Sequence, residues 1–123
     1  MAEKAITNAI IAAYRKRGAF IEKIHATGYQ RRGLPDLIAG YRGKFIGIET
    51  KQPKNKNGVT PAQSEVLLEI VEAGCWGVSV TSLHDALLIL DFIDLTEPQP
   101  KKGHGEISIE SMIALANKLQ SEH

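Results

Sequence analysis

Residues 33–51 read GLPDLIAGYRGKFIGIETK, and this stretch is the most informative part of the chain for the fold. Two apolar runs lie on either side of an Arg-Gly pair, an arrangement that is typical of a tight turn between strands. We therefore expect residues 35–41 and 44–51 to form two strands that pair as a hairpin through a turn over residues 40–44. Because residues two apart in a strand project to the same face, this pairing also determines which polar side chains meet.

The flanking segments predict a mixed sheet with helices on its faces. Before the hairpin, Ile6, Ile10 and Tyr14 fall on one stripe of a helix. After it, a Thr-Pro-x-Gln sequence from Thr60 has the features of a helix start. Since a hairpin comes before a helical crossover, we expect an α/β fold rather than a run of βαβ units. The predicted elements are helix 2–16, strands 19–27, 35–41 and 44–51, helix 60–74, strand 76–80 and a helix from Ser82 to about Phe92.

The C-terminal part of the chain is predicted to lie outside this domain, which spans residues 1–95. Residues 96–107 are rich in Pro, Lys and Gly and are predicted to form a linker. Residues 108–123 are predicted to form an appended amphipathic helix, which either mediates dimerisation or packs on its own domain. Its apolar side contains Ile109, Met112, Ile113, Ala116 and Leu119.

Composition excludes several classes of protein. The chain has 123 residues, of which 43% are hydrophobic and 24% are charged, as expected for one globular domain. Its apolar runs are far shorter than the roughly 20 residues that span a bilayer. No secretory signal is visible, so we expect no membrane association and a cytoplasmic location. The single cysteine excludes an internal disulfide framework.

Basic residues are concentrated in one segment. Residues 14–56 contain eleven Lys and Arg but three Asp and Glu, whereas the rest of the chain contains four Lys and Arg and eleven Asp and Glu. A basic segment in an otherwise acidic chain is typical of proteins that bind polyanions such as nucleic acids. The alternative is a solvated basic face that has no partner.

Three charged residues are predicted to converge at one end of the hairpin. Glu49 and Lys51 share a face of their strand, and the returning strand places Asp36 beside Glu49. Two carboxylates suit a hard divalent cation such as Mg²⁺, and the main-chain carbonyl of Thr50 is available as a further ligand. Lys51 is then placed to orient water or to stabilise developing negative charge. The alternative is a turn aspartate near a surface ion pair, which contributes about 0–1 kcal/mol.

These residues carry a family resemblance. Pro35-Asp36 followed by Glu49-Thr50-Lys51 resembles the signature of the PD-(D/E)xK nucleases. The wider pattern over about residues 3–85 resembles the VRR-NUC (virus-type replication-repair nuclease) domain of small phage and bacterial proteins. The resemblance implies a restriction-endonuclease-like core, Mg²⁺ or Mn²⁺ as the cofactor and a homodimer in a bacterial host cell. It also implies phosphodiester hydrolysis in branched, flapped or four-way-junction DNA, without a small-molecule cofactor.

The resemblance also implies roles for individual residues. Asp36 and Glu49 match the metal-binding carboxylates and Lys51 matches the catalytic lysine. Gln63 matches a glutamine of the helix after the motif, although a capping box with its N-cap residue explains it equally well. Glu3 matches an acidic residue of the first helix that binds the metal directly or through water, and the alternative is a frayed first turn stabilised by the helix dipole.

Six basic residues flank the predicted site and are expected to contact DNA phosphates. They are Arg31, Arg32, Arg42, Lys44, Lys54 and Lys56. The function predicted from the whole sequence is a metal-dependent, structure-selective DNA endonuclease. Two alternatives stay open, namely a non-catalytic DNA-binding module that uses the basic segment 14–56, and a structural protein whose charged cluster is incidental.

Overall fold

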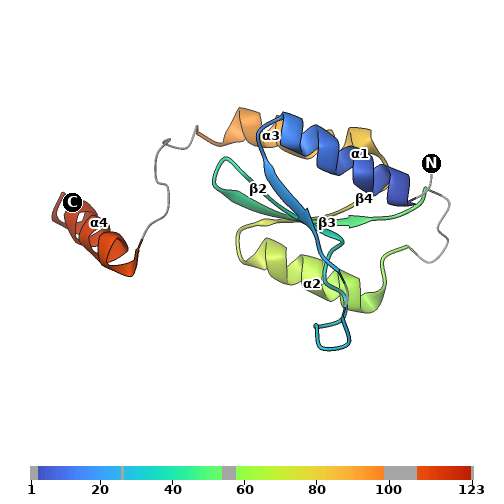
Figure 1. Ribbon diagram of the computed structural model, residues 1–123, viewed down its shortest axis with the longest axis horizontal. Coiled ribbons are helices and arrows are strands. Elements are labelled where there is room, and N and C mark those ends of the chain that lie inside the picture. Colours follow the sequence, from blue (N-terminus) through green and yellow to red (C-terminus); the bar gives the residue numbers. More distant parts are fainter. Residues whose placement is uncertain (1–2, 26, 54–57, 99–107, 123) are drawn as a thin grey trace.

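A four-stranded sheet with helices on both faces forms the centre of the computed structural model, which describes residues 3–25, 27–53, 58–98 and 108–122 (Figure 1). The predicted α/β class and the order of the elements are confirmed. No helix within these described ranges is long and apolar enough to cross a membrane. The elements are α1 (Glu3–Lys16), β1 (Phe20–Lys23), β2 (Leu37–Tyr41), β3 (Lys44–Thr50), α2 (Pro61–Glu72), β4 (Trp76–Val80), α3 (Leu83–Thr96) and α4 (Ile109–Ser121).

The strands are ordered β1-β2-β3-β4, with antiparallel pairing up to β3 and parallel pairing between β3 and β4. Positive φ angles at Arg42 and Gly43 (50° and 77°) produce the tight turn that the sequence predicts between β2 and β3. The first strand is shorter than predicted. It ends at Lys23, which pairs with Leu37, and one further backbone hydrogen bond follows, from the N–H of Ile24 to the carbonyl of Asp36.

The main core lies between the sheet and the layer formed by α1 and α3 (Figure 1). The stripe predicted on α1 is buried, and the hydroxyl of its Tyr14 donates a 2.6 Å hydrogen bond to the carbonyl of Ala86 in α3. The two helices are therefore joined by packing and by a buried polar contact. The fully buried large side chains are Tyr14, Ile6, Ile10, Ile21, Leu37, Ile46, Ile48, Leu90, Ile93 and Thr50.

Helix α3 is longer than predicted, since it continues past Phe92 to Thr96. Ile93 is buried in the core, and Asp94 forms ion pairs with Arg17 and Arg42. These tertiary contacts support an additional helical turn that the helical pattern alone does not require. Residues 99–107 of the predicted linker lie outside the described residues.

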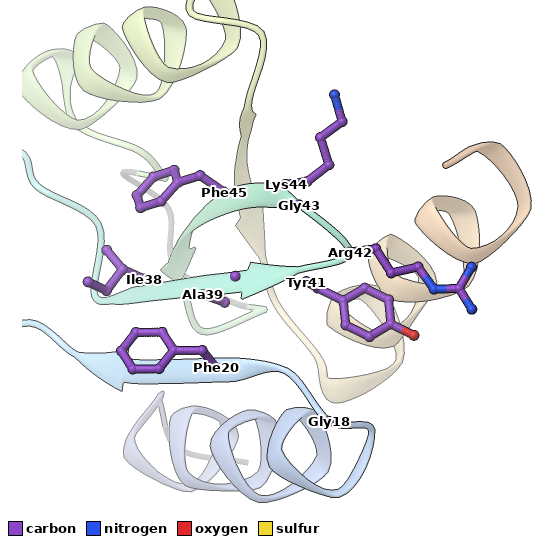
Figure 2. A pocket seen from close by; sticks show the side chains of 10 residues that line it. Gly18, Phe20, Ile38, Ala39, Tyr41, Arg42, Gly43, Lys44 and Phe45 are labelled. Carbon is purple, nitrogen blue, oxygen red and sulfur yellow. The ribbon is translucent and has the colours of Figure 1, made fainter. Parts of the chain in front are cut away.

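Helix α4 begins after the N-cap Ser108, close to the predicted start, and buries none of its residues. Its apolar side chains are exposed. A second exposed apolar surface lies on the sheet, where α2 covers β3 and β4 but not β1 and β2. There Phe20, Gly40 and Phe45 are cross-strand neighbours, and together with Ile38 they line a hollow of about 500 Å³ (Figure 2).

Two glycines allow α2 to pack closely on the other face of the sheet. Gly47 and Gly77 are paired between β3 and β4. A Cβ atom on Gly77 would lie 2.5 Å from the carbonyl oxygen of Leu67, and one on Gly47 would lie 2.8 Å from Cδ1 of Ile70. No side chains separate the helix from the strands at these positions, so α2 lies close to the sheet, and Gln63 in its first turn reaches Glu49 near the end of β3.

We predict that Gly77→Ala lowers the free energy of unfolding by about 1–3 kcal/mol, because the new methyl group meets helix backbone and α2 has to move. Gly40→Ala is the matched control, since its Cβ would meet only Cβ of Phe20 at 4.0 Å. Urea denaturation of both variants measures the difference. Equal stabilities would contradict the proposed role of Gly77 in helix packing.

Candidate metal site

The carboxylate of Glu49 is the centre of a polar cluster at the end of β3. The side chain is 3% exposed, and its Oε1 accepts a 2.9 Å hydrogen bond from Nε2 of Gln63 on α2. Nζ of Lys51 lies 3.7 Å from the same oxygen. The other oxygen, Oε2, is buried and has no hydrogen-bond partner among the described residues. A buried carboxylate oxygen without a donor is costly and is the kind of atom that a cation satisfies.

Asp36 is held beside this cluster by Thr50. Its Oδ2 accepts a hydrogen bond from the main-chain N–H of Thr50 and another from the Thr50 hydroxyl, both at 2.8 Å. The N–H and C=O of one strand residue point to the same side. The carbonyl of Thr50 therefore faces Asp36. On the other side of β3, the N–H of Lys51 donates a hydrogen bond to the carbonyl of Val80 in β4.

Electrostatics link the two carboxylates. Burial raises the pKa of Glu49 to about 8, and repulsion by the negative charge of Asp36 adds to this effect. The positive charge of Lys51 opposes the shift, and Glu3 makes the smallest of the contributions that raise the pKa. The two carboxylates thus repel each other strongly enough that a proton or a cation stabilises the pair.

Gln63 both caps α2 and contacts the carboxylate of Glu49, the two roles that its sequence pattern allows. Its side-chain oxygen accepts a hydrogen bond from the N–H of Thr60 at 2.9 Å, and its own N–H donates to the Thr60 hydroxyl at 3.2 Å. This is the predicted capping box. The amide nitrogen is left to donate to Glu49, so the same side chain caps α2 and positions the buried carboxylate.

The donor set fits a hard divalent cation. Mg²⁺ and Mn²⁺ prefer oxygen ligands, and Mg²⁺ is commonly held by one or two carboxylates together with water. Within the described ranges no three His, Cys, Asp or Glu side chains converge on one point. Glu3 is therefore not a third member of a tight cluster with Asp36 and Glu49, although its charge influences Glu49.

The predicted basic residues divide into separate groups. Arg31 and Arg32 line a cavity of about 650 Å³ next to the carboxylates, together with Asp36 and Gln63. Arg31 also forms an ion pair with Glu69 of α2. The loop that carries both arginines contacts the start of α2 through Gly33 (φ 86°), where a Cβ atom would lie 2.4 Å from the backbone of Ala62.

Arg42 and Lys44 do not flank the carboxylates, contrary to the prediction. They lie at the hairpin turn, at the opposite end of β3 from Glu49; the five residue steps of the strand from Lys44 to Glu49 correspond to about 17 Å. Both form ion pairs with α3, Arg42 with Asp94 at 3.0 Å and Lys44 with Glu97 at 3.6 Å. Residues 54–57, which include the predicted DNA contacts Lys54 and Lys56, lie outside the described residues.

Sequence reasoning missed Thr7 as part of this region. Thr7 on α1 is buried, and its hydroxyl lies 3.0 Å from that of Thr50. The signal was present, since a threonine within the buried stripe of an amphipathic helix requires a hydrogen-bond partner. The partner itself is 43 residues away and is not predictable from the helix alone.

Comparison with known proteins identifies the fold. No family model and no curated protein matches the chain. Among solved structures, the chain is similar to a VRR_NUC domain at a TM-score of 0.59 and 20% sequence identity, over 72% of this chain and 94% of that chain. The chain therefore has the fold of a VRR_NUC domain, which confirms the predicted restriction-endonuclease-like core.

We predict that Glu49 makes the protein less stable as the pH rises in buffer without divalent cations. The native state binds this proton more tightly than the unfolded state, because the pKa is raised from 4.5 to about 8. The contribution to stability is thus complete below about pH 4.5 and decreases by up to about 1.4 kcal/mol per pH unit until the pKa of about 8 is passed.

Urea denaturation of the wild type and of Glu49→Gln between pH 5 and pH 8.5 isolates this contribution. The wild type should lose stability relative to the variant over this range, and added Mg²⁺ should reduce the loss. Parallel pH profiles of the two proteins would show that Glu49 titrates in the ordinary range.

Proposed function

We propose that this protein is a metal-dependent nuclease that hydrolyses phosphodiester bonds in DNA. The observation that carries the proposal is Oε2 of Glu49, which is buried next to Asp36 and Lys51 and has no hydrogen-bond partner in the part of the chain that the structure describes. The similarity of the fold to a VRR_NUC domain supports the same function. Fold alone does not define chemistry, so the proposal depends on the residues of the site.

Asp36 and Glu49 are the proposed ligands of a Mg²⁺ or Mn²⁺ ion, with the carbonyl of Thr50 as a further ligand and Glu3 acting through a water molecule. Such an ion lowers the pKa of bound water and neutralises charge on the phosphate. Gln63 keeps the Glu49 carboxylate in one orientation by its hydrogen bond to Oε1.

Lys51 is the proposed catalytic residue. Its side chain is 13% exposed, and its ammonium group is adjacent to the Glu49 carboxylate. From this position it donates hydrogen bonds to the attacking water or to the negative charge that develops on the phosphate oxygens. A shielded ammonium group stabilises this charge more strongly than one in bulk water.

The proposed path of the DNA backbone runs along the cavity next to the carboxylates. Arg31 and Arg32 supply positive charge at its rim, and the exposed ring of Tyr29 lies on the same loop. Contacts between basic side chains and phosphate groups make the affinity for DNA fall as the salt concentration rises. We propose branched, flapped or four-way-junction DNA as the substrate class.

We further propose that two copies act together, since one domain presents a single site and both strands of a junction require two. The apolar side of α4 is the proposed dimer element, because its large side chains are exposed in one chain. They are Ile109, Met112, Ile113, Leu115 and Leu119.

We predict that Lys51→Ala reduces cleavage of a four-way junction by at least about 100-fold, the scale of losing one preorganised donor. Binding of the same DNA should change little. Lys44→Ala is the matched control, because Lys44 lies at the far end of β3 and is paired with Glu97. The measurement is a cleavage assay on linear, flapped and four-way DNA with Mg²⁺, with Mn²⁺ and with EDTA.

Unaltered cleavage by Lys51→Ala, or cleavage in EDTA, would refute the mechanism. A wild type that binds DNA without cutting it would favour the non-catalytic binding module.

We predict that a chain ending at Pro98 is monomeric, whereas the full chain is dimeric, because truncation removes the exposed apolar face of α4. Size-exclusion chromatography with light scattering measures both masses. A Met112→Glu/Ile113→Glu variant tests the same surface in the full-length chain. A dimer that persists in both proteins would exclude α4 as the dimer element.

A further inference from the structure

Two threonine hydroxyls lie in an otherwise apolar contact between α1 and β3. Thr7 is 4% exposed and Thr50 is 1% exposed, and their Oγ1 atoms are 3.0 Å apart. Thr50 projects to the same face of β3 as the core residues Ile46 and Ile48. Valine has nearly the same shape and no polar atom to bury, so packing alone does not account for this pair.

The hydrogen bonds have a definite direction. The hydroxyl of Thr50 donates to Oδ2 of Asp36 at 2.8 Å. A hydroxyl carries one proton, so Thr7 has to be the donor in its bond with Thr50. The result is a chain of hydrogen bonds from Thr7 through Thr50 to the carboxylate, in which each bond polarises the next.

Thr50 holds the carboxylate with two donors. Its main-chain N–H donates to the same Oδ2 at 2.8 Å, so rotation of the Asp36 side chain breaks two hydrogen bonds at once. Hydrogen bonds to an ionised carboxylate are stronger than those between neutral groups. Both of these bonds use Oδ2, and neither of them uses Oδ1 of Asp36.

We propose that Thr7 and Thr50 are positioning residues, and that their buried hydroxyl relay fixes the orientation of Asp36 for cation binding. The cation-binding part of this inference rests on the proposed function. The relay also links Asp36 to the rotation of α1. Glu3 lies four residues before Thr7 and therefore on the same face of the helix, so the relay also fixes the side of α1 that carries Glu3, whose charge acts on Glu49.

The first test needs no metal. Hydrogen exchange measured by NMR reports on the Thr50 amide, which donates to Asp36, and on the Lys51 amide, which donates to Val80 and serves as the internal control. In Thr7→Val and in the double variant Thr7→Val/Thr50→Val, exchange at position 50 should become about tenfold faster, the factor for one hydrogen bond to a charged group. Exchange at Lys51 should not change.

The second test separates positioning from stability. The double variant loses the bond from Thr50 to Asp36 and with it some stability, but urea denaturation in the assay buffer should show that it is folded. Affinity for Mn²⁺, measured by calorimetry, should nevertheless fall about tenfold in the double variant, and Thr7→Ser should keep the wild-type affinity. Thr81→Val is the matched control, because Thr81 also donates to a carboxylate but at the surface.

The outcomes distinguish this inference from the proposed function. A double variant that keeps both the slow exchange of the Thr50 amide and the wild-type Mn²⁺ affinity would overturn the relay. A wild type that binds no Mn²⁺, but whose Thr50 amide loses protection in Thr7→Val, would overturn the proposed metal site and support the relay.

Discussion

The burial of a carboxylate beside a second carboxylate is the constraint around which this structure is arranged. Glu49 is inside the molecule, and both its burial and the charge of Asp36 disfavour its ionised form. The surrounding groups compensate in part, since Gln63 donates to one oxygen and Lys51 lies nearby. The second oxygen keeps no protein donor among the described residues. A local conflict of this kind inside a well-packed domain is typical of a functional site.

The elements whose own residues form a recognisable pattern were predictable from the sequence. Alternation and the Arg42-Gly43 turn predicted the β2–β3 hairpin, and the capping box predicted the start of α2 at Pro61. Strand β4 has the bounds that were predicted. Convergence of Asp36 with Glu49 followed from the hairpin, because antiparallel strands bring the two ends of the segment together.

Other features depended on contacts that no local pattern contains. Glycines within strands indicate a close approach, but the sequence does not say that α2 approaches Gly47 and Gly77. The partner of Thr7 is equally remote along the chain. The sequence predicts Arg42 at the site because this residue lies in the basic segment 14–56, whereas folding places the acidic Asp94 against it.

The acidic residues of α3 have a consequence for how the molecule meets a polyanion. Asp91, Asp94 and Glu97 neutralise the basic hairpin end of the sheet, so they oppose the field of Arg17, Arg42 and Lys44 there. The arginines at the opposite end, beside the carboxylates, have one described acidic partner, Glu69. Among the described residues Arg32 forms no ion pair, so its charge stays available at the rim of the cavity. A phosphate group that entered the cavity would meet this guanidinium without first displacing a carboxylate.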